Sequence, residues 1–251
     1  MRFDDHGRGA EEAIVVSYRG LQSLLPAFVR RYVLHFECAI ADAVDTFSAH
    51  LPAGCRVLDA GAGEGQYADR FTRHRYTGVD LGIGDDAWNY GQLSAIADLL
   101  ALPFSDNTFD ASLNVVTLEH VREPLQVIVE LHRVLRPGGR LLLIVPHEWE
   151  EHQQPHDYFR YTRYGVRYML ETSGFGAIDI QPVGGFFRLL SRRLFNAAQF
   201  FPGPLSLVAL LFFAPAALLM PLFEPLDKQK NFTLGFICTC QKPPNDANSS
   251  R

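Results

Sequence analysis

The chain has 251 residues, of which 47% are apolar, so it is long enough to bury the core of one α/β domain and still carry an appendage. Its formal net charge of −5 argues against a nucleic-acid partner, because such partners usually require a basic face. Its four cysteines lack zinc-ligand spacing and predict neither a disulfide framework nor a metal centre. The polar N-terminus contains no apolar signal core, so we expect a cytoplasmic protein.

The first 50 residues predict a helical layer. Residues 1–12 are polar, and apolar and polar residues recur at helical spacing over 14–50. Because Pro26 is a break, we expect a helix from Ala27 to Val44. This layer is expected either to pack on the core or to cover a substrate.

A glycine-rich stretch follows the first predicted strand, Arg56–Leu58. Asp59 comes next, and a helix pattern follows over Tyr67–Arg73. Between them, glycines occupy every second position, at Gly61, Gly63 and Gly65. Glycines at this spacing let the backbone turn tightly and bring its N–H groups close to a ligand. The stretch therefore predicts a nucleotide-like ligand at the carboxyl edge of a parallel sheet.

The spacing of these glycines separates two classes of nucleotide site. The dinucleotide fingerprint leaves two residues between its second and third glycines, whereas here a single residue separates them. An NAD-dependent oxidoreductase is therefore disfavoured.

Two further predicted strands also end in an acid. Tyr76–Asp80 lies about 20 residues beyond the first strand, where a carboxylate can accept both ribose hydroxyls. A loop over Leu81–Gln92 separates it from a third strand, Ser94–Asp98. Three consecutive strands that each end in Asp favour a ligand site over a glycine turn with a purely structural role.

The second half of the chain predicts four more strands, which are Ala111–Val116, Arg140–Val145, Ala177–Val183 and Phe232–Gln241. The second of these is a continuous apolar run, as is typical of a strand buried on both faces. A helix that ends at Leu135 is expected before it. Another is expected over Arg163–Glu171, with Thr162 as its N-cap.

Several motifs resemble the class I S-adenosylmethionine (SAM)-dependent methyltransferases, in particular the Methyltransf_11 or UbiE-like family. The stretch D-A-G-A-G-E-G at 59–65 is similar to the family's D-x-G-x-G-x-G motif. Three further signatures are L-P-F-S-D-N-T-F-D at 102–110, L-E-H-V at 118–121 and L-R-P-G-G-R-L-L-L at 135–143. The resemblance covers residues 55 to about 180.

This resemblance implies an α/β, Rossmann-like class I methyltransferase fold. Its sheet would be seven-stranded and mostly parallel, with helices on both faces. The seventh strand would run antiparallel between strands five and six. An apolar helical insertion would lie between strands six and seven.

The resemblance also implies SAM as the cofactor. Asp59 and the loop Gly61–Gly65 would hold its methionine end, Asp80 the ribose, and Asp98 with Leu99 the adenine. Asn114 would lie beside the methyl group or the acceptor. The expected cofactor-binding residues are Asp59, Gly61, Ala62, Gly63, Gly65, Tyr67, Asp80, Leu81, Asp98, Leu99 and Asn114.

The loop over 146–163 is the expected acceptor side, because it follows the fifth strand and opens over the same sheet edge. His147 and His156 in this loop, together with His120 after the fourth strand, are the candidate catalytic bases. A metal site made by His147, His152 and His156 is an alternative, but their spacing matches no known ligand pattern, so no metal is expected. A purely structural role for the loop is an equal alternative.

An uncharged stretch over 194–223 contains a segment, 205–223, that is long enough to span a bilayer. A single span would place strands six and seven on opposite sides of the membrane. We therefore expect a re-entrant or interfacial hairpin whose helices are broken at Pro202, Pro204, Pro215 and Pro221. It would bind the inner face of the membrane peripherally, with cationic anchors at Arg188, Arg192, Arg193, Lys228 and Lys230. The alternative is that the stretch packs on the sheet, covers the acceptor pocket or forms a dimer face.

These expectations divide the chain into an N-terminal helical cap (1–50), a SAM-binding domain (51–190 and 230–242), an apolar insertion (191–229) and a disordered tail (243–251). The expected function is methyl transfer from SAM to a small-molecule or lipid-like acceptor. No N-P-P-Y tetrapeptide follows the fourth strand, which disfavours methylation of DNA adenine or of glutamine. The alternative is a catalytically inactive, membrane-tethered partner protein that binds SAM or a nucleotide.

Overall fold

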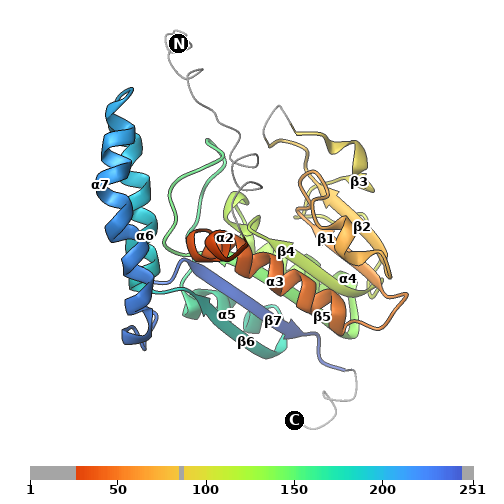
Figure 1. Ribbon diagram of the computed structural model, residues 1–251. Helices are drawn as coiled ribbons and strands as arrows, with labels where there is room; N and C mark the ends of the chain where they lie inside the picture. The colour runs from red at the N-terminus through yellow and green to blue at the C-terminus, as the bar shows by residue number, and fades with distance from the viewer. Residues whose placement is uncertain (1–26, 85–87, 245–251) are drawn as a thin grey trace, which may run out of the picture.

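A single seven-stranded sheet forms the centre of the protein (Figure 1). The computed structural model describes residues 27–84 and 88–244. The strand order is β3-β2-β1-β4-β5-β7-β6. Neighbouring strands from β3 to β5 pair in parallel, whereas β7 runs antiparallel to both β5 and β6. The predicted class I order, with an inserted antiparallel last strand, is confirmed.

The strands lie close to the predicted positions, except that β5 begins at Leu135, five residues before the predicted Arg140. They are β1 (Arg56–Ala60), β2 (Arg75–Asp80), β3 (Ala95–Ile96), β4 (Phe109–Val115), β5 (Leu135–Pro146), β6 (Gly176–Val183) and β7 (Gly235–Gln241). The central strands β1 and β4 are mostly buried, and β5 is completely buried over its continuous apolar run, 141–145. The four cysteines are free thiols, and Cys238 and Cys240 are buried on the same face of β7.

Helices cover both faces of the sheet. Helix α3 (His35–His50) packs on one face through Phe36, Ile40, Val44 and Phe47. Helices α4 (Pro124–Val134) and α5 (Arg163–Thr172) pack on the other face. The apolar residues of α4 recur at helical spacing, so a single stripe of the helix is buried. Thr162 caps α5 as predicted, because its hydroxyl accepts a hydrogen bond from the Gly165 N–H.

The N-terminal layer differs from its prediction. The expected helix Ala27–Val44 is two helices, α2 (Ala27–Val33) and α3, which are separated at Leu34. Leu34 is buried, so the break directs an apolar side chain into the core. The predictions for residues 1–26, and those for 245–251 in the tail, fall outside the described residues.

Two predicted elements near the glycine loop are shorter in the structure. The helix expected over Tyr67–Arg73 is a 3₁₀ helix at Ala68–Phe71, which buries Phe71 against the sheet. The third strand is limited to Ala95–Ile96, because it lies at the sheet edge and pairs with β2 alone. Asp98 therefore lies beyond the strand rather than at its end.

The apolar insertion is a pair of helices that stands beside the sheet at the β6 and β7 end (Figure 1). Helix α6 (Phe186–Asn196) and helix α7 (Leu205–Leu219) lie side by side, and the Ser191 hydroxyl donates to the Ala217 carbonyl oxygen over 2.6 Å. Pro215 lies inside α7, so the prediction that this proline breaks the segment is wrong. Together with a 3₁₀ turn, the helix runs over Leu205–Leu226 and is long and apolar enough to span a membrane, while 17% of its most apolar window is buried.

Four of the five predicted cationic anchors of the insertion, all except Lys228, have partners inside the described part of the protein. Arg192 forms ion pairs with Glu37 and Glu150, and Arg193 also pairs with Glu150. The other two anchors with contacts are Arg188, which donates to the Tyr32 carbonyl oxygen, and Lys230, which pairs with Glu224. These side chains attach the insertion to the rest of the fold.

Candidate functional site

The glycine loop leaves β1 at the carboxyl edge of the sheet. Gly61, Gly63 and Gly65 all have positive φ, at 87°, 54° and 80°. Residues with a Cβ rarely adopt this region, which is why glycine occupies alternate positions here. The N–H groups of Gly61 and Ala62 both donate to the Val79 carbonyl oxygen and fix the loop against β2.

Asp59 is buried at the end of β1, with 1% of its surface exposed. Its Oδ2 accepts a hydrogen bond of 2.6 Å from the Tyr76 hydroxyl. Its Oδ1 has no hydrogen-bond partner among the described residues. Burial raises the pKa of this carboxyl group to about 7, although the Tyr76 hydrogen bond opposes the rise. A buried acceptor without a partner is suited to an ammonium or hydroxyl group of a ligand.

Gly61 is in close contact with the strand on its other side. A Cβ atom at Gly61 would lie 2.2 Å from Cγ2 of Thr117, which follows β4. The Thr117 hydroxyl donates to the Gly61 carbonyl oxygen over 3.2 Å. The loop therefore has no room for a side chain at this position. The close approach and the unpartnered Asp59 oxygen together fit the methionine end of SAM.

Asp80 holds two loops at the end of β2. Its Oδ2 accepts from the Gly63 N–H and its Oδ1 from the Gly82 N–H, both at 2.9 Å. Each carboxylate oxygen has a second lone pair, so Asp80 retains the capacity to accept ribose hydroxyls. The structure thus brings Asp80, at the end of β2, to the glycine loop that follows β1. The sequence predicted this, because both strands were expected to end at the same edge of the sheet.

The remaining predicted cofactor residues lie around this core. Asp98 is exposed and its Oδ1 accepts from the Leu100 N–H, while Leu99 is buried. Leu81 follows Asp80 and is 43% exposed. Tyr67 is largely buried, and burial raises the pKa of its hydroxyl group. Asn114 is fully buried in β4 and donates to the Ala60 carbonyl oxygen over 2.7 Å. Asn114 therefore braces the end of β1.

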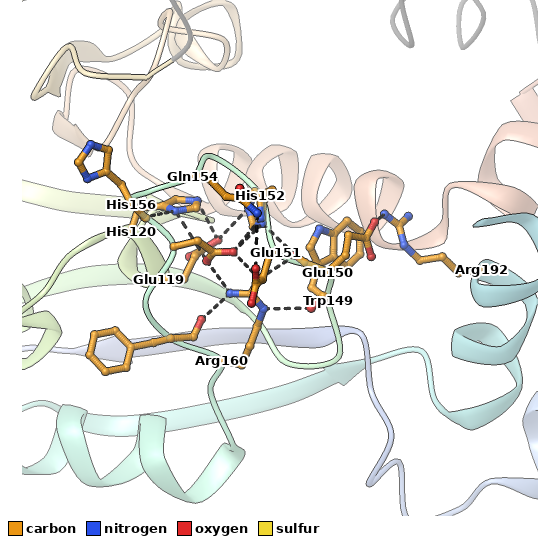
Figure 2. A network of polar contacts seen from close by, with 12 residues as sticks. Glu119, His120, Trp149, Glu150, Glu151, His152, Gln154, His156, Arg160 and Arg192 are labelled. Carbon is orange, nitrogen blue, oxygen red and sulfur yellow. Dashed lines mark hydrogen bonds and ion pairs between the residues drawn. The ribbon is translucent and has the colours of Figure 1, made fainter. Parts of the chain in front are cut away.

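His120, one of the candidate bases, belongs to a polar network shown in Figure 2. It follows Glu119 in a 3₁₀ helix, Leu118–His120, directly after β4. The ring of His152 lies against it, with centroids 4.7 Å apart. Burial lowers the pKa of His120. A neutral imidazole at this edge has a free lone pair and could act as a base.

The other two candidate bases do not join His120 and His152. The His147 Nδ1 contacts the Tyr161 carbonyl oxygen at 2.8 Å, and its ring packs near Phe236. The His156 Nδ1 contacts the Tyr158 hydroxyl at 3.2 Å, and its ring points away from the network (Figure 2). Among the described residues, the structure gathers Glu119, His120 and His152, rather than the alternative set His147, His152 and His156.

Several residues that the sequence did not single out also contribute to the site. Trp88 packs against Gly63, with a ring carbon 3.4 Å from the position that a Cβ would take. Tyr76 and Thr117 contact Asp59 and Gly61 as described above. A lone aromatic in a loop carries no sequence signal, so Trp88 could be found only from the fold. Tyr76, by contrast, lies inside a predicted strand, two positions away from Gly78.

Comparison with known families and proteins agrees with the fold and the glycine loop. A methyltransferase domain family matches residues 58–143. The demethylmenaquinone methyltransferase of Thermobifida fusca is 34% identical over 143 residues, which are 53% of this chain and 57% of that protein. The ubiquinone/menaquinone biosynthesis C-methyltransferase UbiE of Roseobacter denitrificans is 34% identical over 106 residues, 37% of this chain and 42% of that protein. The chain spans about half the length of these curated relatives.

A solved structure extends the likeness over nearly the whole fold. The 1,6-didemethyltoxoflavin-N1-methyltransferase of Burkholderia thailandensis was solved with 1,6-didemethyltoxoflavin and S-adenosylhomocysteine bound. It aligns with a TM-score of 0.53 at 20% identity and covers 95% of this chain and 98% of its own. At this identity the likeness shows the fold alone.

Proposed function

We propose that the chain acts as a class I SAM-dependent methyltransferase of the UbiE-like type and transfers a methyl group to a small, hydrophobic, quinone- or lipid-like acceptor. The observation that carries the proposal is the buried Asp59 carboxylate beside the positive-φ glycine loop, with one oxygen that lacks a partner among the described residues. The relatives named for quinone methylation support the acceptor class.

Different residues of the chain would bind different parts of SAM. Asp59 and the loop Gly61–Gly65 would hold the amino-acid end of SAM, Asp80 the ribose, and Asp98 with Leu99 the adenine. SAM supplies an activated methyl group on a sulfonium. The protein's task is then to align an acceptor with that group and to exclude water.

The acceptor side would be built from the loop after β5 and the end of β4. His120 is the best placed of the three candidate bases, because it lies three residues beyond Thr117, which touches the glycine loop. A hydroxyl acceptor would use such a base, whereas a carbon or amine acceptor needs none. His147 and His156 would shape the loop through their contacts with Tyr161 and Tyr158.

The exposed apolar face of α7 supports a role at a membrane surface. Leu207, Val208, Leu211 and Phe212 are each at least 59% exposed. So much exposed apolar surface on one helix marks an interaction site. A helix pair that returns to the same sheet would lie in the interface of the cytoplasmic face rather than cross the bilayer. This placement would bring a lipid-soluble acceptor close to the site.

The proposal is tested in two stages with the full chain. Calorimetric titration with SAM measures binding, and transfer of a labelled methyl group from SAM is then assayed separately on the lipid extract and the aqueous extract of cells. We expect SAM binding and label in the lipid extract. Label in the aqueous extract alone would overturn the acceptor class, and binding without transfer to either extract would favour the inactive partner protein.

A further inference from the structure

Three potential metal ligands from two distant segments meet beside the candidate acceptor site. Glu119 and His120 follow β4, and His152 comes from the loop after β5 (Figure 2). One ligand atom from each lies within 4.8 Å of the other two. The Glu119 Oε1 is 3.7 Å from Nε2 of His120 and 3.9 Å from Nε2 of His152. The fold, rather than the sequence spacing, creates this group.

Both histidines present the same nitrogen to Glu119. The Nδ1 of His120 lies 2.8 Å from the His156 carbonyl oxygen, and a carbonyl can only accept, so this nitrogen carries the proton. The Nδ1 of His152 lies 3.1 Å from the Glu150 carbonyl oxygen, which assigns its proton in the same way. In both neutral rings Nε2 is then the atom with the free lone pair. Metal-binding histidines are usually oriented by such an Nδ1–H bond to a carbonyl group.

The centre of the group lacks the partners that a buried polar cluster needs. Glu119 is fully buried, and neither of its carboxylate oxygens has a hydrogen-bond partner among the described residues. The same is true of Nε2 of His120. Burial raises the pKa of Glu119 to about 8, and when its carboxyl group is ionised three acceptor atoms face one another without a donor between them. A buried carboxylate is costly unless a cation or donors compensate it.

We propose that Glu119, His120 and His152 form a binding site for a divalent transition-metal ion of the Zn²⁺ class. Two imidazoles and one carboxylate are a ligand set that such ions accept. In a tetrahedral site, ligand atoms are separated by about 3.4 Å, given bonds of about 2.1 Å. The two observed Glu119–His separations, 3.7 and 3.9 Å, exceed this by a few tenths of an ångström, and the ligand atoms of the two histidines lie within 4.8 Å of each other, so the side chains would have to close on the ion by rotation.

The nearby cation does not replace the metal. The positive charge of Arg160 acts on Glu119 and lowers its pKa against the larger effect of burial, but the N–H groups of Arg160 are directed elsewhere. Two nitrogens bond the Asp157 carboxylate, and further contacts go to the carbonyl oxygens of Trp149, Glu150 and Phe159. Asp157 in turn faces the Nδ1 side of both histidines, at 3.9 Å and 3.4 Å. It would therefore orient the rings rather than bind the metal.

Three protein ligands leave at least one coordination position for an outside oxygen. Structural zinc sites are usually closed by four protein ligands, whereas sites with three keep a position for water or substrate. With its Nε2 bound to the metal, His120 would not act as the base of a methyl transfer. A metal here would lie at the carboxyl end of β4, on the side of the sheet edge that we assign to the acceptor. This last step rests on the proposed function, whereas metal binding itself does not.

The test uses the full chain after dialysis against a chelator, without SAM. Zn²⁺ is titrated by calorimetry, and Co²⁺ by its visible absorption, which reports ligand number and type. We expect one ion per chain and a tetrahedral or five-coordinate Co²⁺ spectrum without a thiolate charge-transfer band. His152→Ala and Glu119→Gln should each weaken Zn²⁺ binding at least tenfold, whereas His50→Ala, which removes an exposed histidine at the end of α3, should bind like the wild type.

Equal Zn²⁺ affinity in the wild type and in both ligand variants would overturn the proposal, as would a Co²⁺ spectrum dominated by thiolate ligands. His152 is partly exposed, so His152→Ala is expected to fold even if Glu119→Gln does not. SAM affinity is measured on the same metal-free samples. A chain that binds Zn²⁺ but not SAM would contradict the proposed function and would still support the metal site.

Discussion

Tyr76 donates a hydrogen bond of 2.6 Å to Oδ2 of Asp59, while Oδ1 of the same carboxylate has no partner among the described residues. One oxygen therefore ties the end of β1 to β2. Under the proposed function, the other would accept a hydrogen bond from SAM. Because the group is fully buried, its pKa is raised to about 7, close to the pH at which the protein is expected to work.

The first prediction concerns the pH dependence of SAM binding. The ammonium group of SAM should bind the ionised form of Asp59, so affinity should rise as this carboxyl group loses its proton. With a pKa of about 7 for Asp59 and about 7.8 for an α-amino group, we expect affinity to increase about fivefold between pH values of about 6 and 7.5 and to fall again at higher pH. Calorimetry in buffers of different ionisation enthalpy should also detect proton release. A flat profile between these pH values would show that Asp59 does not pair with the ligand.

The same carboxyl group should affect stability with a defined sign. Its pKa is about 7 in the folded protein against an ordinary value of 3.8, so the folded state binds the proton more tightly. The cost of burying the charge is absent below about pH 4 and fully present above about pH 7. Asp59→Asn removes this cost. As the pH rises from about 4 to about 7, the wild type should therefore lose about 1–3 kcal/mol of unfolding free energy relative to the Asp59→Asn variant. Urea unfolding of both proteins without SAM measures the difference. A constant difference would contradict the raised pKa.

Gly61→Ala should abolish SAM binding. The new Cβ would lie 2.2 Å from the Thr117 side chain, at a backbone φ of 87° that alanine disfavours. The loop would have to move away from β4, which removes the close approach that a ligand needs. Gly54→Ala is a matched control, because Gly54 has a similar φ of 81° but nothing within 4 Å of the added atom. It should lose about 1 kcal/mol of stability and keep SAM affinity. Equal SAM affinity in Gly61→Ala would show that the loop does not contact the ligand.

The fold was largely predictable, because buried strands and amphipathic helices have clear periodic patterns. The errors occurred where local sequence and tertiary context disagree. Pro215 was expected to end a helix, yet α7 continues through it. The pattern after Gly65 was expected to be a regular helix, but the chain there makes turns and one 3₁₀ segment to bury Phe71.

The site was predictable only in part. Asp59, Asp80 and the glycines end or follow strands, so the strand order brings them together. The histidines lie in an irregular loop, where spacing does not determine which rings meet. That His152 approaches Glu119, while His147 and His156 do not, depends on the path of that loop, including the bidentate ion pair between Arg160 and Asp157. No sequence pattern encodes this path.

Arg192 should hold the apolar insertion against the loop that follows β5, residues 147–162. Its guanidinium lies 3.6 Å from the centroid of the Trp149 ring and pairs with Glu37 and Glu150. A largely buried cation–π contact contributes up to about 2 kcal/mol, so Arg192→Ala should destabilise the protein by about 1–3 kcal/mol and speed hydrogen exchange over residues 147–162. Arg167→Ala removes an exposed helical pair with Glu171 and should cost less than about 0.5 kcal/mol. If the two variants are equally stable, the coupling is absent.

The exposed face of α7 should determine membrane binding. Leu211 and Phe212 are 68% and 77% exposed, so replacing both by Asp leaves the core intact and should change the free energy of unfolding by less than about 0.5 kcal/mol. Burying each side chain in lipid is worth about 1.5–3 kcal/mol, and the double variant should therefore bind anionic vesicles at least about tenfold more weakly in flotation assays. Tyr164→Asp alters an aromatic residue that is 78% exposed on α5, and it should float like the wild type. If the wild type does not float, the face is not a membrane surface. If the variant instead loses a dimer seen in solution, the face is a contact between copies of the chain.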